Sequence, residues 1–176
     1  MKEWCDINRL SINFKKTNYM IIKSNKKKIA NTFKLKLPNK DGSEYTLEKK
    51  TLHKISWVLI DDAILWNYHI SYTCSRISRN RGIFLKLRHF LPLKQLGQLY
   101  YNLIYPYLSY AIIAWGSASA SHLKKIHVKQ NRIIRLIFFA TLYGKNTDSA
   151  LPLMNLLDIL TVENIFILRL LQFSHQ

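Results

Sequence analysis

The centre of this sequence is a long run without charged side chains, and this run limits most strongly how the chain can fold. Residues 95–123 contain no Asp, Glu, Lys or Arg, and aromatic side chains are concentrated in residues 99–115. Such a run either spans a bilayer or forms helices that are buried in a protein core. Asn102, Pro106 and Ser109 interrupt it, and cations flank it on both sides. We therefore expect two packed core helices, and no membrane partner.

The charge balance restricts the class of partner. Lys and Arg number 27 against 10 Asp and Glu, which gives a formal net charge of +17. Residues 1–60 carry 14 basic and 5 acidic side chains, residues 61–145 carry 12 and 2, and residues 146–176 carry 1 and 3. This excess favours a polyanionic partner such as nucleic acid. The last segment is expected to be packing scaffold.

The cysteines and the N-terminal residues indicate an intracellular protein, in the nucleus or the cytoplasm. Cys5 and Cys74 are the only cysteines, so neither a disulfide framework nor a zinc cluster is available. The first residues lack the apolar core of a signal peptide. The six histidines are scattered, and we expect the chain by itself to bind no metal.

The N-terminal third has the residue pattern of short strands. We expect a short helix over residues 5–12. Strands are expected over residues 19–24, 33–37, 45–47 and 55–60. Residues 33–37 alternate apolar and basic side chains, and residues 38–42 have turn chemistry, so 33–37 and 45–47 are expected to pair as an antiparallel ribbon.

The pattern becomes helical after Asp61, which with Asp62 is a candidate helix cap. Apolar residues recur every three or four positions, Gly82 is expected to loosen the first helix, Pro92 to start the next and Pro106 to end it. The expected helix 122–139, capped by hydroxyls in residues 119–121, has one apolar side and one basic side. Its apolar side consists of Leu123, Ile126, Gln130, Ile133, Ile134 and Ile137, and its basic side of Lys125, Lys129, Arg132 and Arg135.

The C-terminal part is expected to contain a loop over residues 144–149 and two short apolar helices over 151–160 and 162–173. The predicted fold class is therefore α+β, with small antiparallel β elements in residues 1–62 followed by a mostly helical bundle in residues 63–176.

An ordered set of motifs in this bundle is similar to the thumb of a non-LTR retrotransposon reverse transcriptase of the jockey-like type. The set comprises Leu91-Pro92, Leu99-Tyr100, Ile104–Tyr110, Trp115-Gly116, Leu123–Ile126 and Gln130–Arg132. Residues 4–21 resemble the end of that family's palm, and residues 54–79 resemble its primer-grip hairpin and first thumb helix. The resemblance extends from Trp4 to about Phe173.

The resemblance implies that this chain by itself does not catalyse the family's reaction. The family's activity is RNA-directed DNA synthesis with magnesium at paired palm aspartates, which would lie upstream of Met1. We therefore expect no catalytic residue, no bound cofactor, no small-molecule substrate, and contact with the backbone of an RNA/DNA duplex without sequence specificity. The alternative is a basic nucleic-acid-binding or interaction module without a polymerase role.

The resemblance also implies the site residues. Phosphate contact is expected at Arg76, Arg79, Arg81, Lys86, Arg88, Lys124, Lys125, Lys129, Arg132 and Arg135. Lys16 and Thr17 correspond to the last palm motif. Ile55, Ser56 and Trp57 correspond to the primer grip, where Trp57 replaces a glycine of the family. A turn that needs positive φ at this position would therefore be blocked.

Two motifs permit more than one interpretation. Asp61-Asp62 after an apolar strand superficially resembles a two-metal site, but residues 1–60 can scarcely build a palm around it, so we expect a strand end and a helix cap. The aromatic side chains stack on unpaired bases or fill a core, and their spacing favours the core. They are Tyr100, Tyr101, Tyr105, Tyr107, Tyr110 and Trp115.

Overall fold

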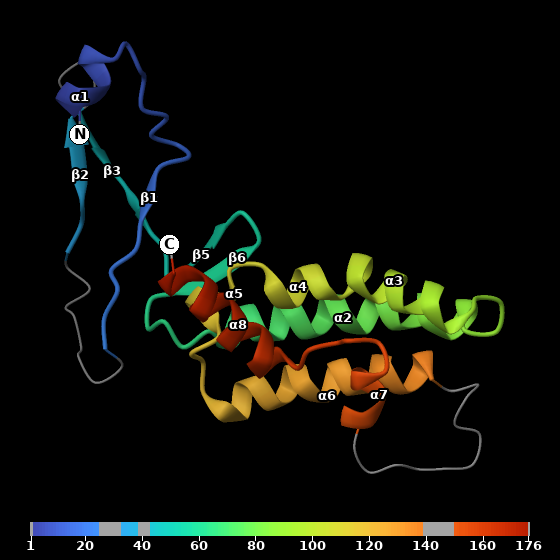
Figure 1. Cartoon of the computed structure of the whole chain (residues 1–176). Coiled ribbons are helices and arrows are strands. Elements are labelled where there is room, and N and C mark those ends of the chain that lie inside the picture. The colour runs from blue at the N-terminus through green and yellow to red at the C-terminus, as the bar shows by residue number, and fades with distance from the viewer. Residues whose placement is uncertain (1, 25–32, 39–42, 139–149, 176) are drawn as a thin grey trace. The chain divides into compact units, whose positions relative to one another are not determined.

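The chain mixes α and β structure and divides into two compact units (Figure 1). The computed structural model describes residues 2–24, 33–38, 43–138 and 150–175. The first unit spans residues 1–64 and contains the strands, whereas the second spans residues 65–176 and is helical. At this coarse level the predicted α+β class is confirmed.

The described part of the first unit contains one short helix and three two-stranded sheets. Its elements are α1 (Lys2–Ile7), β1 (Asn18–Tyr19), β2 (Lys36–Pro38), β3 (Glu44–Thr46), β4 (Glu48–Lys49), β5 (Leu52–Ile55) and β6 (Val58–Asp61). Strand β1 pairs in parallel with β4. Of the strand expected over residues 19–24, only Tyr19 is in a strand.

The expected antiparallel ribbon is present. Strand β2 pairs with β3, and Leu37 lies opposite Tyr45. Lys36 Nζ also lies 2.7 Å from Glu44 Oε2, which joins the two strands across the solvent-exposed face. Most of the predicted turn, residues 39–42, lies outside the described residues.

The single strand expected over residues 55–60 is wrong, because the chain reverses inside it. Strands β5 and β6 form an antiparallel hairpin in which Ile55 lies opposite Val58. The connection is therefore only Ser56 and Trp57, and Ser56 adopts a φ of 53°. A two-residue hairpin loop needs positive φ at its first position, which alternation of apolar residues does not reveal.

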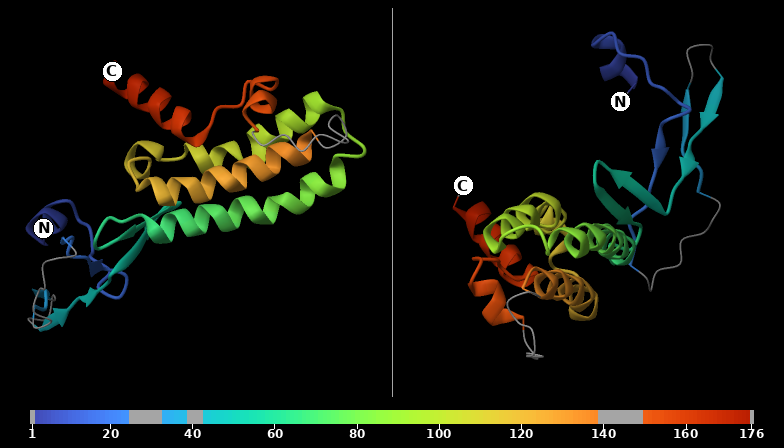
Figure 2. Two further views of the ribbon diagram at one scale, coloured as in Figure 1. Left: turned by 90° about the horizontal axis from the view of Figure 1, so that it is seen from below. Right: turned by 90° about the vertical axis from the view of Figure 1, so that its right-hand side faces the viewer.

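The second unit is organised around two long helices that lie side by side (Figures 1 and 2). Its helices are α2 (Asn67–Leu87), α3 (Leu93–Leu103), α4 (Tyr105–Ser109), α5 (Ile112–Trp115), α6 (Ala120–Ile137), α7 (Leu151–Asn155) and α8 (Val162–Ser174). Helices α2 and α6 run in the same direction, as the colour gradient in Figure 1 shows. Ile70, Ile77 and Phe84 are fully buried on α2, and their seven-residue spacing aligns them on one face.

Helix α2 begins later than the sequence predicts and is not loosened at Gly82. It begins at Asn67 after Trp66, whose φ is 63°, so neither Asp61 nor Asp62 caps it. It also continues through Gly82 without a break. A Cβ at Gly82 would meet no atom within 4 Å, so the glycine faces open space and the core contacts of its neighbours hold the helix.

The charge-free run forms core helices, as predicted, but it is divided into three helices where two were expected. Helices α3, α4 and α5 bury a stripe with helical spacing, which consists of Leu96, Tyr100, Ile104, Leu108, Ile112 and Trp115. Pro106 lies in the first turn of α4, and α3 ends before it. Within the parts of the chain that the structure describes, none of the helices has both the length and the apolar character to cross a bilayer.

Helix α6 buries its predicted apolar side. Ile126, Gln130, Ile133, Ile134 and Ile137 are all buried, whereas Leu123, which was predicted with them, is half-buried. The expected hydroxyl cap is wrong, because the N-cap residue Ser119 makes no capping side-chain bond and its Oγ lies 3.1 Å from Ser121 Oγ instead. The two hydroxyl groups bond to each other, so they do not cap the first backbone amides of α6.

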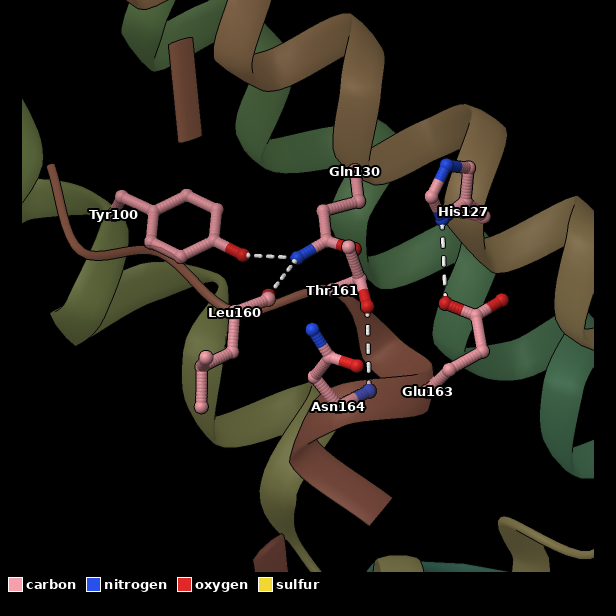
Figure 3. A network of polar contacts seen from close by, with 7 residues as sticks. All are labelled: Tyr100, His127, Gln130, Leu160, Thr161, Glu163 and Asn164. Carbon is pink, nitrogen blue, oxygen red and sulfur yellow. Dashed lines mark hydrogen bonds and ion pairs between the residues drawn. The ribbon is translucent and has the colours of Figure 1, made fainter. Parts of the chain in front are cut away.

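Helix α8 is fixed against α6 by polar contacts (Figure 3). Thr161 Oγ1 caps α8 by accepting from the Asn164 amide at 3.2 Å. His127 Nδ1 on α6 lies 3.5 Å from Glu163 Oε2 on α8. The helix before it, α7, is shorter than the predicted 151–160, and the loop expected over 144–149 lies outside the described residues.

Candidate functional site

The strongest candidate site is the basic surface of α2 and α6. Neither helix contains an Asp or Glu, and the sequence has no acidic residue from 63 to 147. Nine of the ten predicted phosphate contacts lie within the two helices, and Arg88 follows as the C-cap residue of α2. Cations without interspersed acids produce a positive potential that attracts polyanions.

Two of these cations are engaged within or next to their own helix. Arg76 Nε donates to the Tyr72 hydroxyl at 3.1 Å, and its guanidinium lies 5.1 Å from the Tyr72 ring centroid. Arg88 Nε donates to His89 Nε2 at 3.1 Å. These arginines are thus partly committed to local contacts.

Three other cations converge on one cleft between the two helices. The cleft has a volume of about 150 Å³ and is lined by Ile77, Ser78, Arg81, Lys129, Arg132 and Ile133. Ile77 and Ile133 are 0% and 1% exposed and belong to the core beneath it. Arg81 and Arg132 are exposed and Lys129 is half-buried. The tertiary structure therefore selects a small group from the larger basic set.

Helical geometry explains why these positions are selected. Ile77 and Arg81 are four residues apart on α2, and Lys129 and Arg132 are three apart on α6, so each pair lies on one flank of its helix. Arg79 is two positions from Arg81, which is about 200° around the helix at about 100° per residue. By the same rule Lys124 lies about 140° from Lys129.

Two lysines on the basic side of α6 lie near Cys74, which belongs to α2. Burial raises the pKa of the Cys74 thiol, whereas the nearby charges of Lys129 and Lys125 act in the opposite direction. Both ammonium groups are therefore close enough to α2 to influence a side chain on it. Because its pKa is raised overall, Cys74 is a neutral thiol and not an activated nucleophile.

The aromatic residues are divided between the core and the surface. Tyr100 and Trp115 are fully buried, and Trp115 Nε1 donates to the Tyr110 carbonyl oxygen at 2.9 Å. The core interpretation is therefore confirmed for Tyr100 and Trp115. Tyr105 and Tyr107 are half-buried, whereas Tyr101 and Tyr110 are exposed.

The palm-motif residues Lys16 and Thr17 belong to the first unit, in the turn before β1. The Lys16 amide donates to Asn13 Oδ1 at 3.2 Å, and Thr17 Oγ1 donates to the Asn13 carbonyl oxygen at 2.9 Å. The Lys16 side chain is exposed. The structure therefore gives Thr17 a role in closing the turn.

The primer-grip residues form the tip of the β5–β6 hairpin. Trp57 is 52% exposed, and Lys54 Nζ lies 5.5 Å from its ring centroid. Positive φ falls on Ser56 and not on Trp57. The condition under which Trp57 would block the turn is therefore not met, because the turn places positive φ one residue earlier.

Asp61 and Asp62 lie where β6 ends and the chain turns. Asp61 ends β6 as predicted, is 5% exposed, and its Oδ1 accepts from the Ala63 amide at 3.1 Å. Among the residues that the structure describes, no group of three His, Cys, Asp or Glu side chains could hold a metal ion. The carboxylate of Asp61 closes the turn after β6.

Sequence reasoning did not single out Ser78 or the buried floor as parts of the site. The available signal was spacing, since Ser78 lies three residues before Arg81 and one after the core residue Ile77.

Comparison of the chain with protein-family models, with curated proteins and with solved structures gives no match.

Proposed function

We propose that this chain corresponds to the last palm elements and the thumb of a non-LTR retrotransposon reverse transcriptase. In this proposal the first unit is the palm remnant with its primer-grip hairpin, and the second unit is the thumb. The chain acts in the nucleus or cytoplasm, holds an RNA/DNA duplex by its backbone, and does not add nucleotides by itself. The family's magnesium-binding aspartates have no counterpart among the residues that carry the resemblance.

One observation carries the binding part of the proposal. The basic side chains of α2 and α6 lie on two adjacent helices that contain no acidic residue. Such a surface neutralises phosphates and releases their condensed counterions. The contacts position a duplex without reading its sequence, since they reach phosphates and not base edges.

The test is fluorescence anisotropy with a labelled RNA–DNA duplex at several salt concentrations. We expect a Kd of about 10⁻⁶ to 10⁻⁴ M at physiological salt, and a steep linear fall of log K with log salt. Changing the duplex sequence should leave the Kd unchanged. Absence of binding, or binding that ignores salt, would refute the proposal.

Primer extension tests the catalytic part. The purified chain with a template–primer, magnesium and deoxynucleotides should give no product above background. Product formation that disappears in Asp61→Asn would show that the tandem acids are catalytic, against the present assignment.

Sub-micromolar binding that is indifferent to duplex or single-stranded form would favour the alternative, a basic nucleic-acid-binding module without a polymerase role.

A further inference from the structure

We infer that the cleft between α2 and α6 is a discrete subsite for one backbone phosphodiester group, held by Arg81, Lys129 and Arg132. This inference rests on the proposed duplex binding and makes it more specific. It replaces a uniform basic surface with one anchoring point and several weaker contacts around it.

The first argument is the convergence of like charges. Arg81 reaches the cleft from α2, and Lys129 and Arg132 reach it from α6. Among the residues that the structure describes, none forms an ion pair or a hydrogen bond with these three side chains. Like charges on facing helices repel each other, and an anion between them removes that repulsion.

The second argument is the shape of the site. The buried side chains of Ile77 and Ile133 form its floor, and the cations stand on both of its walls. A charge beside an apolar floor is screened less than one in bulk water. The volume of about 150 Å³ accommodates a small anionic group between the two walls.

The third argument is donor chemistry. Two guanidinium groups supply planar pairs of N–H donors, the ammonium group supplies a point charge, and Ser78 adds a hydroxyl. A tetrahedral phosphodiester presents oxygens toward both walls at once, and guanidinium groups bind such oxygens in a bidentate manner. Free phosphate shares this chemistry, so the experiment must separate the two sources.

The experiment compares cleft cations with matched cations on the same helices. Arg81→Gln and Lys129→Gln remove cleft charges, whereas Arg79→Gln and Lys124→Gln remove exposed charges that point elsewhere by helical position. All four substitutions remove one charge, and circular dichroism with thermal unfolding verifies the fold. Arg81→Lys retains the charge without the planar fork.

Each cleft variant should weaken binding of the RNA–DNA duplex by about tenfold or more and lower the slope of log K against log salt by about 1. The two variants outside the cleft remove peripheral phosphate contacts, so each should weaken duplex binding less than the cleft variants do, by about threefold or less. Arg81→Lys should fall between wild type and Arg81→Gln. The double variant Arg81→Gln/Lys129→Gln should lose less than the product of the single losses, because both groups hold one phosphate.

Equal losses at all four positions would overturn the subsite while the proposed duplex binding stands. No duplex binding by the wild type would overturn both. Inorganic phosphate at matched ionic strength should compete only weakly against the duplex; competition as effective as that of the duplex would assign the cleft to free phosphate. Preferential binding of anionic phospholipid vesicles through Arg81 and Lys129 would also overturn the inference.

Discussion

Gln130 Nε2 donates to the Tyr100 hydroxyl oxygen over 2.8 Å inside the core of the helical unit (Figure 3). The same nitrogen donates to the Leu160 carbonyl oxygen at 2.7 Å. One side chain thus joins α3, α6 and the segment that leads into α8. Because Gln130 and Tyr100 are both 0% exposed, these bonds cannot be replaced by water without opening the core.

Removing the Tyr100 hydroxyl should therefore destabilise the helical unit. Tyr100→Phe leaves the Gln130 amide with one acceptor fewer, and we expect a loss of about 1–3 kcal/mol in the free energy of unfolding, measured with urea. Gln130→Met serves as the partner substitution of similar size. The double variant should be more stable than the sum of the single losses predicts, and additivity would contradict a direct bond.

Gly82 is a site at which a substitution should stabilise the chain. Gly82→Ala places a methyl group in open space on the exposed side of α2. An interior helical glycine costs about 0.5–1 kcal/mol relative to alanine, so the melting temperature should rise by about 1–4 °C.

Gly116→Ala is the matched comparison for this prediction. A Cβ at Gly116 would overlap the Phe166 ring and lie 2.6 Å from the Ile112 carbonyl oxygen, so the same substitution should lower the melting temperature. A rise at Gly116, or a fall at Gly82, would show that the glycine environments differ from those described.

His69 should make the stability depend on pH. It is 3% exposed, its ring centroid lies 5.4 Å from that of Trp115, and burial lowers its pKa from 6.5 to about 4. The unfolded chain therefore takes up the proton first. The stabilising contribution is complete above pH 6.5 and decreases as the pH falls toward about 4, by about 3 kcal/mol in total.

His69→Gln removes this titration. Urea unfolding between pH 7 and pH 4 should give a shallower loss of stability for the variant than for the wild type. The difference between the two proteins isolates the histidine, because the carboxylates titrate in both. Identical slopes would mean that His69 is accessible to protons in the folded chain.

The hairpin turn gives a prediction for the first unit. Ser56 has a φ of 53°, a conformation that costs other L-residues about 1–2 kcal/mol and glycine little. Ser56→Gly should therefore raise the stability of the β5–β6 hairpin, as measured by amide hydrogen exchange at Val58 and Ile60, whose amides face β5. Trp57→Gly should not raise it, because Trp57 has no positive φ.

The apolar stripes of the helices follow from local residue spacing alone. The spacing of Tyr100 and Ile104, and of Ile126, Gln130 and Ile133, predicts the buried faces of α3 and α6 correctly. The polar and proline interruptions of the charge-free run and the cations on both its sides predict core helices in place of a membrane span, and turn chemistry predicts the pairing of β2 with β3. These features are local, since each depends on residues a few positions apart.

Only the tertiary structure decided which distant side chains act together. It reversed the chain at Ser56, started α2 after Trp66, and paired the Gln130 amide with Tyr100. It also brought Arg81 to the same cleft as Lys129, whereas Arg79, only two residues away, lies on another side of α2. The physical reason is that the packing of α2 against α6 fixes the rotation of both helices, and a sequence pattern within one helix does not contain that rotation.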